Sequence, residues 1–274
     1  NDQLLQLKMN FSWRVFSKCF TPVSLYPYQI DDLASWLRAD SNVTFSIPTK
    51  KVSVIGDGSG NGNGVAQTTS TRQPLRYTYG GGALDKTMLT FGTPTPRDVL
   101  ISNNNFTTDG TTAQEFTIFE VSKINAVSDA AFGYFHLTDG SYIEMGTNAA
   151  GHYTGSVSDG TTLLTASSGG IATGEYHIGC LRKTNRSIFV DYKSVTTSSN
   201  LTDYDAAFDL TVSFENESFR IGGTTESDGL IPPASVAARY LDGDFQEAII
   251  YDRKLSDSEM STVDDYLNKK YRIY

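Results

Sequence analysis

The residue types that most often perform chemistry in proteins are few and scattered in this chain of 274 residues. Its three histidines, His136, His152 and His177, lie in strand-like segments without the spacing of metal ligands. The chain contains no Gly-x-Ser-x-Gly motif, phosphate-binding loop or Cys-x-x-Cys pair. We therefore interpret the histidines as surface or hydrogen-bonded sheet residues, with a ligand or acid–base role as the less favoured alternative.

The carboxylates do not show the pattern of a glycoside hydrolase. Such enzymes need two carboxylates roughly 5 to 10 Å apart, which a strand of alternating acids would supply. Asp203 and Asp205 alternate in a polar, loop-like stretch, and Glu215 and Glu217 flank Asn216 ahead of a strand. We interpret these acids as solvated charges at the rim of the fold. The sequence therefore predicts a protein that is not an enzyme and has no catalytic residues.

Calcium is the one cofactor that the sequence allows, because several of its loops contain acidic residues. Loop carboxylates and backbone carbonyls bind this ion without a compact motif. Three loop aspartates are the candidate metal ligands: Asp57, Asp139 and Asp159. No other cofactor is predicted.

Tyrosines are the candidate ligand-binding residues. Aromatic rings can stack on the apolar face of a sugar ring, and the chain contains 15 Tyr. Tyr134, Tyr142 and Tyr153 lie on neighbouring predicted strands, where they would form a shallow sugar-binding surface. In a two-sheet sandwich, the more common arrangement is that such rings pack within the fold and keep their hydroxyl groups at its rim.

The elements that would position these residues are mostly β-strands. Short runs of aromatic and β-branched residues alternate with clusters of Gly, Asn, Asp and Ser, a spacing typical of a two-sheet sandwich. The clearest runs cover residues 87–91, 98–101, 115–121, 132–137, 141–145, 176–182, 187–192, 218–221 and 245–251. Residues 30–40 are expected to form a short helical turn that runs into a strand.

Turn residues predict how some of these strands connect. Asp139-Gly140 favours a two-residue hairpin, which would pair Leu137 with Tyr142 and Phe135 with Glu144.

Further turns are predicted at residues 183–186 and 56–64. The second segment, GDGSGNGNG, must be a loop, because its glycines favour positive φ and cannot hold a regular strand.

One helix is predicted near the end of the chain. Ser256 and Glu259 form a capping box, and Leu255 and Met260 form a hydrophobic staple around it. Apolar residues then recur on one face, so the helix should run to about Lys270 and lie across the sandwich.

The first residues form a separate arm. Residues 5–15 alternate strictly between apolar and polar, which predicts a strand with one apolar face. We divide the chain into an arm and linker, residues 1–29, and a sandwich domain, residues 30–274. The arm is expected to pair with a neighbouring subunit or an upstream domain, giving a homo-oligomer or a larger assembly. Folding back onto its own sandwich is the alternative.

Composition narrows the class of partner. The net charge of −9 argues against a nucleic-acid partner, and no apolar run approaches the roughly 18 residues of a membrane span. Cys19 and Cys180 are too few for a disulfide scaffold, and either one bridge or two free thiols fits the sequence.

Five segments, taken together, indicate a resemblance to a known protein family. They are LASWLRAD (33–40), DGSGNGNGVAQTTSTRQPLRY (57–77), GEYHIGCLRKTNRSIFVDYKSV (174–195), SFRIGG (218–223) and GDFQEAIIYDRKLSDSEMSTVDDYLNKKY (243–271). Together they resemble the concanavalin A-like lectin/glucanase superfamily, in the laminin-G-like form of bacterial, phage and viral surface proteins. The resemblance implies an all-β jelly-roll sandwich of two antiparallel sheets. It does not imply an enzyme, because the glucanase branch carries a Glu-x-Asp-x-x-Glu-like strand that this chain lacks.

The resemblance and the tyrosines lead to one preferred hypothesis of function. The chain is expected to be a non-catalytic carbohydrate-binding or adhesion module on an extracellular or virion surface, with a surface glycan as its partner. The alternative is a structural virion component, such as a decoration or fibre protein, that binds only other protein chains. A glycoside hydrolase is the least favoured function.

Overall fold

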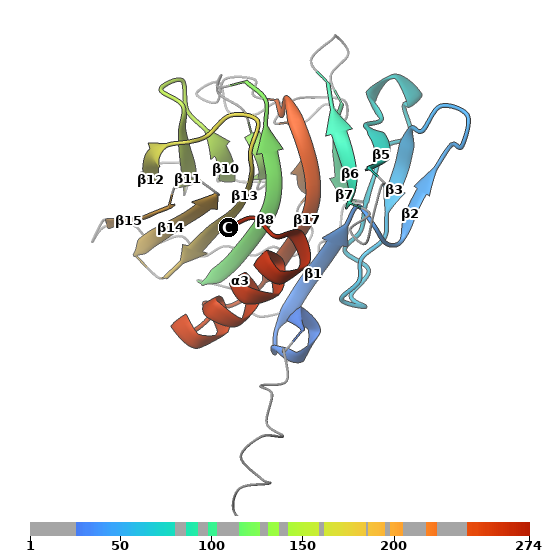
Figure 1. Ribbon diagram of the computed structural model, residues 1–274. Coiled ribbons are helices and arrows are strands. Elements are labelled where there is room, and N and C mark those ends of the chain that lie inside the picture. Colours follow the sequence, from blue (N-terminus) through green and yellow to red (C-terminus); the bar gives the residue numbers. More distant parts are fainter. Residues whose placement is uncertain are drawn as a thin grey trace, which may run out of the picture.

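The computed structural model describes residues 26–79, 86–92, 98–102, 115–126, 131–136, 142–158, 162–184, 186–194, 198–204, 218–223 and 240–274. Within them the chain forms two antiparallel sheets packed face to face, and helix α3 lies across the outside of one sheet (Figure 1). The predicted all-β sandwich with one C-terminal helix is confirmed. The predicted arm strand at residues 5–15 lies outside the described residues.

The first sheet has eight strands. Their order is β15-β14-β13-β8-β17-β6-β5, and β1 pairs with β17 beside this path. The strands are β1 (Leu33–Arg38), β5 (Leu75–Tyr79), β6 (Lys86–Phe91), β8 (Phe116–Ile124), β13 (Tyr176–Lys183), β14 (Ser187–Ser194), β15 (Ser198–Tyr204) and β17 (Gly243–Tyr251). The predicted turn at 183–186 joins β13 to β14, where the Thr184 N–H donates to the Ser187 carbonyl at 2.8 Å.

The second sheet has nine strands in the order β12-β11-β10-β9-β16-β7-β4-β3-β2. They are β2 (Val43–Phe45), β3 (Val52–Ile55), β4 (Val65–Ala66), β7 (Leu100–Ser102), β9 (Ala131–His136), β10 (Tyr142–Thr147), β11 (His152–Ser158), β12 (Leu163–Gly170) and β16 (Ser218–Ile221). A short 3-10 helix, η2 (Ser70–Arg72), lies in the connection between β4 and β5. Strands far apart in sequence are therefore neighbours in this sheet, as β9 and β16 show.

The register between β9 and β10 differs from the prediction. The structure pairs Phe135 with Ile143, whereas the expected two-residue hairpin pairs Phe135 with Glu144. Tyr142 accordingly lies opposite His136. The predicted register is wrong by one residue.

Core packing explains the observed register. On its other edge β9 pairs with β16, where Phe135 lies opposite Phe219. Phe219 and Ile143 are both buried in the core between the sheets. A one-residue slip would turn one of these strands over and move its apolar side chains to the wrong face, so the packing outweighs the local turn preference.

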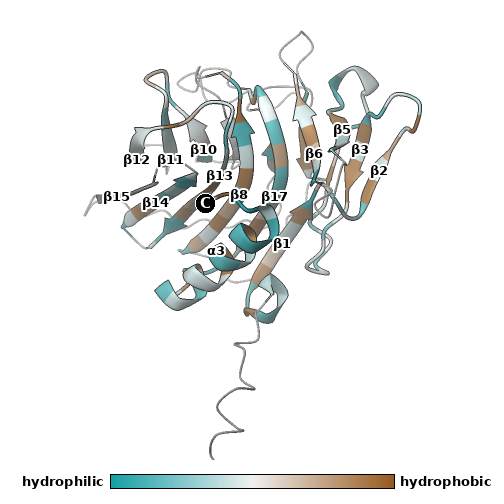
Figure 2. Cartoon of the chain, in the orientation of Figure 1, coloured by the Kyte–Doolittle hydropathy of each residue, from teal (hydrophilic) through white to brown (hydrophobic). Residues whose placement is uncertain are grey.

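A hydrophobic core fills the space between the sheets, and a second apolar cluster lies under α3. Strand β8 contributes to both, because its residues alternate between two apolar surroundings. Phe116 and Ile118 belong to the core, while Phe119 and Val121 belong to the cluster under the helix. Figure 2 shows apolar and polar bands following one another along these strands.

The segment before β1 is part of the folded unit. The 3-10 helix η1 (Pro27–Gln29) precedes the strand, a few residues before the helical turn expected from the sequence. The Tyr251 hydroxyl donates to the Pro27 carbonyl at 3.1 Å, and Ile30 is buried in the cluster under α3. Residues 26–29, which the sequence assigns to the linker, therefore contact the sandwich, and the division between residues 29 and 30 stays a prediction.

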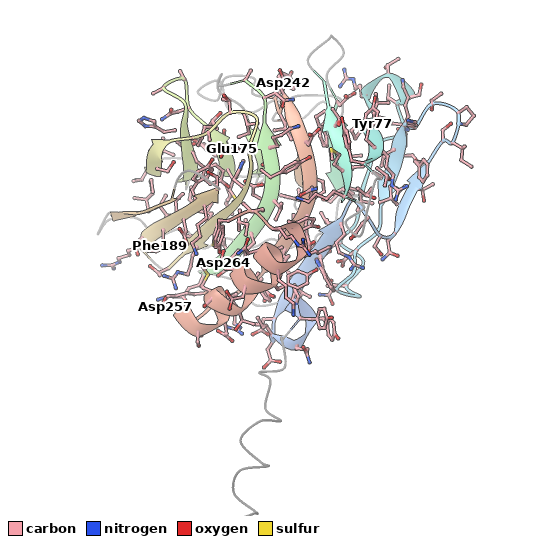
Figure 3. All side chains as sticks on the ribbon, in the orientation of Figure 1. Tyr77, Glu175, Phe189, Asp242, Asp257 and Asp264 are labelled. Atoms are coloured by element: carbon pink, nitrogen blue, oxygen red, sulfur yellow. The ribbon has the colours of Figure 1, made fainter. Side chains whose placement is uncertain are left out.

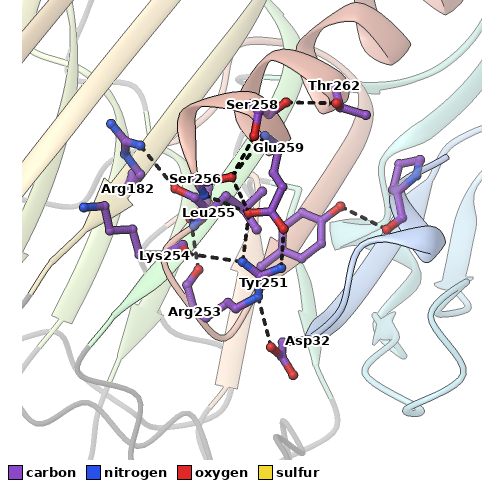
Figure 4. A network of polar contacts seen from close by, with 12 residues as sticks. Asp32, Arg182, Tyr251, Arg253, Lys254, Leu255, Ser256, Ser258, Glu259 and Thr262 are labelled. Atoms are coloured by element: carbon purple, nitrogen blue, oxygen red, sulfur yellow. Dashed lines mark hydrogen bonds and ion pairs between the residues drawn. The ribbon is translucent and has the colours of Figure 1, made fainter. Parts of the chain in front are cut away.

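Helix α3 (Asp257–Tyr271) begins with the predicted capping box. The Ser256 hydroxyl accepts the Glu259 N–H, and the Glu259 carboxylate accepts the Ser256 N–H at 2.8 Å (Figure 4). Two hydrogen bonds from Arg253, at 2.7 and 3.0 Å, hold the same carboxylate and lower the pKa of Glu259 to about 2. Among the described residues, no helix is long and apolar enough to cross a membrane.

We expect α3 to stabilise the sandwich. Ser256→Ala removes the cap acceptor and should lower the free energy of unfolding by about 1 kcal/mol. Leu267 is fully buried in the cluster under the helix, so Leu267→Ala should cost about 2 to 5 kcal/mol. Chemical denaturation measures both. An unchanged denaturation midpoint for the Leu267 variant would show that the helix is peripheral.

A buried carboxylate joins α3 to the sheet beneath it. Glu247 of β17 is fully buried and accepts hydrogen bonds from the Trp36 indole at 2.5 Å and the Lys270 ammonium at 2.7 Å. The hydroxyl groups of Tyr266 and Tyr271 donate to the same carboxylate at 3.1 and 2.5 Å. Three helix side chains and one strand side chain therefore converge on a single acid.

Candidate ligand-binding face

The two sheets differ in what occupies their outer faces. Part of the outer face of the eight-stranded sheet is apolar and lies under α3. On the nine-stranded sheet the outer face is polar, as β10 shows: Ile143 and Met145 belong to the core, and Glu144 between them faces the other way. The outer face of the nine-stranded sheet therefore carries polar side chains.

A row of polar positions crosses five strands of this face. Glu144 of β10 lies opposite Tyr134 of β9 on one side and Ser156 of β11 on the other. Beyond them, Arg220 of β16 pairs with Tyr134, and Thr165 of β12 pairs with Ser156. Directly paired residues of antiparallel strands share a face, so all five positions, called the polar row below, lie on the same side of the sheet.

A second row runs beside the first, two residues further along each strand. It contains Ser218, His136, Tyr142, Ser158 and Leu163 in register. The Tyr142 side chain is half-buried, and Leu163 is 53% exposed at the sheet edge. Two of the predicted tyrosine positions, 134 and 142, are thus brought to one face on adjacent strands.

Burial increases along the polar row from the sheet edge inward. Thr165 is exposed, Ser156 is 8% exposed, Glu144 is 3% exposed and Arg220 is fully buried. The hydroxyl groups of Ser156 and Thr165 are 3.1 Å apart, within hydrogen-bond distance. The face therefore presents hydroxyl groups at an open edge and charged groups at depth.

The charged groups of this face are few. Within the nine strands as described, Glu144 is the only carboxylate and Arg220 the only Lys or Arg. Glycoside hydrolysis by the common mechanisms uses two carboxylates. Hydroxyl groups, an aromatic ring and one acid instead suit hydrogen bonding and ring stacking, which are the interactions of a binding site.

Comparison with known proteins finds similarity in structure but not in sequence. No family model and no curated protein matches the chain. A GH54 α-L-arabinofuranosidase superposes with a TM-score of 0.56 at 14% identity, covering 88% of this chain and 60% of that one. Domain 4 of AbnA, an extracellular arabinanase from Geobacillus stearothermophilus, gives 0.49 at 13% identity, covering 85% of this chain and 97% of that domain. The LG1-3 region of the laminin α2 chain gives 0.44 at 14% identity, covering 54% of this chain and 28% of that one.

The architecture of the matching structures is the two-sheet antiparallel jelly roll. The chain has a concanavalin A-like fold. The fold expected from the sequence resemblance is therefore confirmed. At these low sequence identities, the similarity establishes only the fold. The ligand has to be inferred from the residues of the outer face.

Tyr153 is not on the outer face of the concanavalin A-like sandwich, and its prediction as a surface residue is wrong. It is fully buried in the core between the sheets. Its hydroxyl donates to Glu120 at 2.8 Å, and burial, followed by the charge of Glu120, raises the pKa of the phenol. A sugar in solution cannot stack on this ring. The roles of Tyr134 and Tyr142 in ligand binding stay predictions.

Asp57 organises the loop that covers the edge of β1 in this concanavalin A-like domain. Its carboxylate accepts hydrogen bonds from the backbone N–H groups of Trp36, Ser59 and Asn63 at 2.8 to 3.0 Å. The Ser59 hydroxyl donates to it as well, at 2.5 Å. These four donors fix the carboxylate and hold the loop against β1.

Calcium binding at Asp57, Asp139 and Asp159 stays a prediction. Asp139 and Asp159 lie outside the described residues. In the part of the chain that the structure describes, no three His, Cys, Asp or Glu side chains are grouped so that they could hold a metal ion.

The three histidines occupy different surroundings. His177 is buried in the core, where its Nε2 lies 2.9 Å from the Glu120 carboxylate and 3.1 Å from the Ser122 hydroxyl. This is the hydrogen-bonded sheet histidine that the sequence predicts. His152 is half-buried at the start of β11, and position 136 lies in the second row of the outer face.

Sequence analysis missed Glu144, Ser156 and Arg220 as members of the site. A signal for them exists, because each alternates with apolar residues that face the core. The alternation shows that these residues point away from the core, but only the strand order shows that they fall in one row. Arg220 is 76 residues from Glu144 in sequence, yet both are paired with the strand that carries Tyr134.

Proposed function

We propose that this chain is a carbohydrate-binding or adhesion module that holds a glycan on the outer face of its nine-stranded sheet. The observation that carries the proposal is the polar row with Tyr142 beside it. A sugar ring has apolar faces and a rim of hydroxyl groups, so it matches the half-buried ring of Tyr142 beside the hydroxyl groups at the open edge of the polar row. The proposal includes display on an extracellular or virion surface, with a surface glycan as partner.

The proposed site should bind weakly as a single copy. One half-buried ring and a few hydrogen bonds to hydroxyl groups offer little binding energy once the cost of association is subtracted. Several copies that engage one glycan-covered surface would bind it far more tightly. Adhesion by this chain would therefore depend on multivalent display.

The test is binding to a panel of soluble oligosaccharides, measured by isothermal titration calorimetry. The panel includes arabino-oligosaccharides, since an arabinofuranosidase and an arabinanase domain are among the structural matches. Tyr142→Ala should weaken binding about tenfold, the loss expected when a central aromatic contact is truncated. Glu144→Gln should weaken binding less than Tyr142→Ala, because the carboxylate is only 3% exposed.

The matched control is Tyr79→Ala. Tyr79 is 72% exposed on β5 of the other sheet, so its loss should leave binding unchanged. If Tyr142→Ala and Glu144→Gln bind as the unchanged chain does, or if no glycan binds, the outer face is not a sugar site. The structural alternative, a chain that binds only other proteins, would then be favoured.

The same oligosaccharides test for hydrolysis. Because Glu144 is the single carboxylate of the described strands of this sheet, we expect no release of reducing sugar. Turnover that disappears in Glu144→Gln would overturn the non-catalytic part of the proposal.

A further inference from the structure

A pocket of about 220 Å³ lies on the opposite side of the molecule from the polar row, between α3 and the outer face of the eight-stranded sheet. Its walls come from β8, β13, β14 and the N-terminal half of α3. Figure 3 labels three of the lining residues, Phe189, Asp257 and Asp264. Nothing in the proposed sugar-binding function involves this pocket.

The floor of the pocket is apolar. Phe119 and Ile178 line it from the sheet, and Cys180 lies beside them as a free, buried thiol. Met260 of α3 approaches from the other side, with its sulfur 3.9 Å from the Cys180 sulfur. Burial raises the pKa of the thiol, so this side chain stays neutral. A ligand on this floor would therefore meet only uncharged groups.

The rim of the pocket is charged, and its two cations already have close partners. Arg182 donates to Asp257 at 2.7 Å and to the Leu255 carbonyl at 3.2 Å. Lys193 donates to Asp264 at 2.7 Å. Neither cation is left without a carboxylate, so an anionic ligand would have to displace an existing ion pair.

The carboxylates of the rim outnumber the cations. Asp191, Asp257 and Asp264 line the pocket with Arg182 and Lys193, which leaves one excess negative charge. Asp191 is the loosely held acid, because its carboxylate lies 3.6 Å from the Lys193 ammonium. Burial raises the pKa of Asp191, and the nearby Lys193 offsets part of that rise.

We propose that this pocket binds an organic cation, an ammonium group carried on an apolar body about the size of a six-membered ring. A cavity of roughly 150 Å³ holds benzene, so the larger pocket can hold a ring with one attached group. The ring would contact Met260 and Phe189, the partly exposed apolar side chains of the lining, and the ammonium would donate to Asp191. The cation would also neutralise the excess charge of the lining.

The test is a titration with benzylamine in which nuclear magnetic resonance monitors the methyl groups of the methionines. The chain has four methionines, Met9, Met88, Met145 and Met260, and Met260→Leu assigns the one in the pocket. Benzylamine should shift the Met260 methyl resonance saturably, in the millimolar range typical of so small a ligand. Met88 and Met145, which are buried elsewhere, should not shift and serve as internal controls.

Two further ligands test whether the positive charge of benzylamine contributes to binding. Benzyl alcohol keeps the ring and replaces the ammonium with a neutral hydroxyl group, and benzoate replaces it with an anion. Both should bind more weakly than benzylamine. If either binds as tightly, or if benzylamine gives no saturable shift at Met260, the proposal is wrong.

Two variants test the role of Asp191. Asp191→Asn should weaken benzylamine binding about fivefold, the effect of losing one partly exposed charge pair. Lys193→Met removes a competing cation and should tighten binding. Unchanged Met88 and Met145 resonances show that a variant is folded. If Asp191→Asn does not fold, Lys193→Met decides, and binding that is unchanged or weaker in that variant would overturn the proposal.

Discussion

Glu247→Ala is expected to lower the free energy of unfolding by about 3 to 5 kcal/mol, the cost of breaking a buried charged network from one side. The fully buried carboxylate accepts hydrogen bonds from Trp36, Tyr266, Lys270 and Tyr271. Its removal leaves Trp36, Tyr266 and Tyr271 without this acceptor and leaves Lys270 with Asp40 as its carboxylate partner. Chemical denaturation monitored by tryptophan fluorescence measures the loss, because Trp36 is one of the donors.

The matched control for this prediction is Asp40→Ala. Asp40 pairs with the same Lys270 at 3.0 Å, but its side chain is 36% exposed. An exposed ion pair of this kind contributes about 1 kcal/mol or less. Equal losses for the two variants would contradict the view that Glu247 anchors the helix to the sheet.

Gly179→Ala is expected to destabilise the core by about 3 kcal/mol or more, because it adds volume and disturbs a buried hydrogen bond at once. Gly179 of β13 lies directly opposite Glu120 of β8. A Cβ atom at this position would overlap the Tyr153 hydroxyl and lie 2.6 Å from the Glu120 carboxylate. Both groups are fully buried, so neither can move aside without breaking the hydrogen bond between them.

A second glycine provides the control. A Cβ atom on Gly169, in β12, would meet nothing within 4 Å. Gly169→Ala should therefore change the free energy of unfolding by no more than about 0.5 kcal/mol, as for surface substitutions in general. If the two variants have the same denaturation midpoint, the core around Glu120 is looser than the structure indicates.

Local sequence signals were sufficient to predict helix α3. The Ser256–Glu259 capping box and the recurring apolar face predicted its start, and its end was expected one residue before the observed Tyr271. A cap is a contact between residues three positions apart, so the sequence contains all of it. The loop at 56–64 was predictable for the same reason, since glycine preferences are local.

Strand pairing was less predictable because its causes are not local. The Asp139-Gly140 dipeptide favours a tight turn, yet the register of β9 depends on Phe219, a residue of β16 that is 84 positions from Phe135 in sequence. A pattern of alternation shows that a strand has two faces. Which face meets the core depends on the neighbouring strands.

In the candidate site too, some features can be predicted from a single strand and others depend on the order of the strands. Tyr153 shares a strand face with Val157, which belongs to the core, so the alternation of β11 alone could have placed it inside. Tyr142 and Glu144 share the face of β10 that points away from the core. The row from Arg220 to Thr165 needs the order of five strands, and no single segment of the sequence contains that information.

The central claim is that a glycan binds on the outer face of the nine-stranded sheet. The most direct measurement is a crystal structure of the chain with an oligosaccharide that binds it in the panel. The account predicts electron density for a sugar ring beside Tyr142 and toward Thr165, the exposed end of the polar row. Density elsewhere, for example on the exposed, stacked rings of Tyr26 and Tyr28, with the outer face empty, would contradict it.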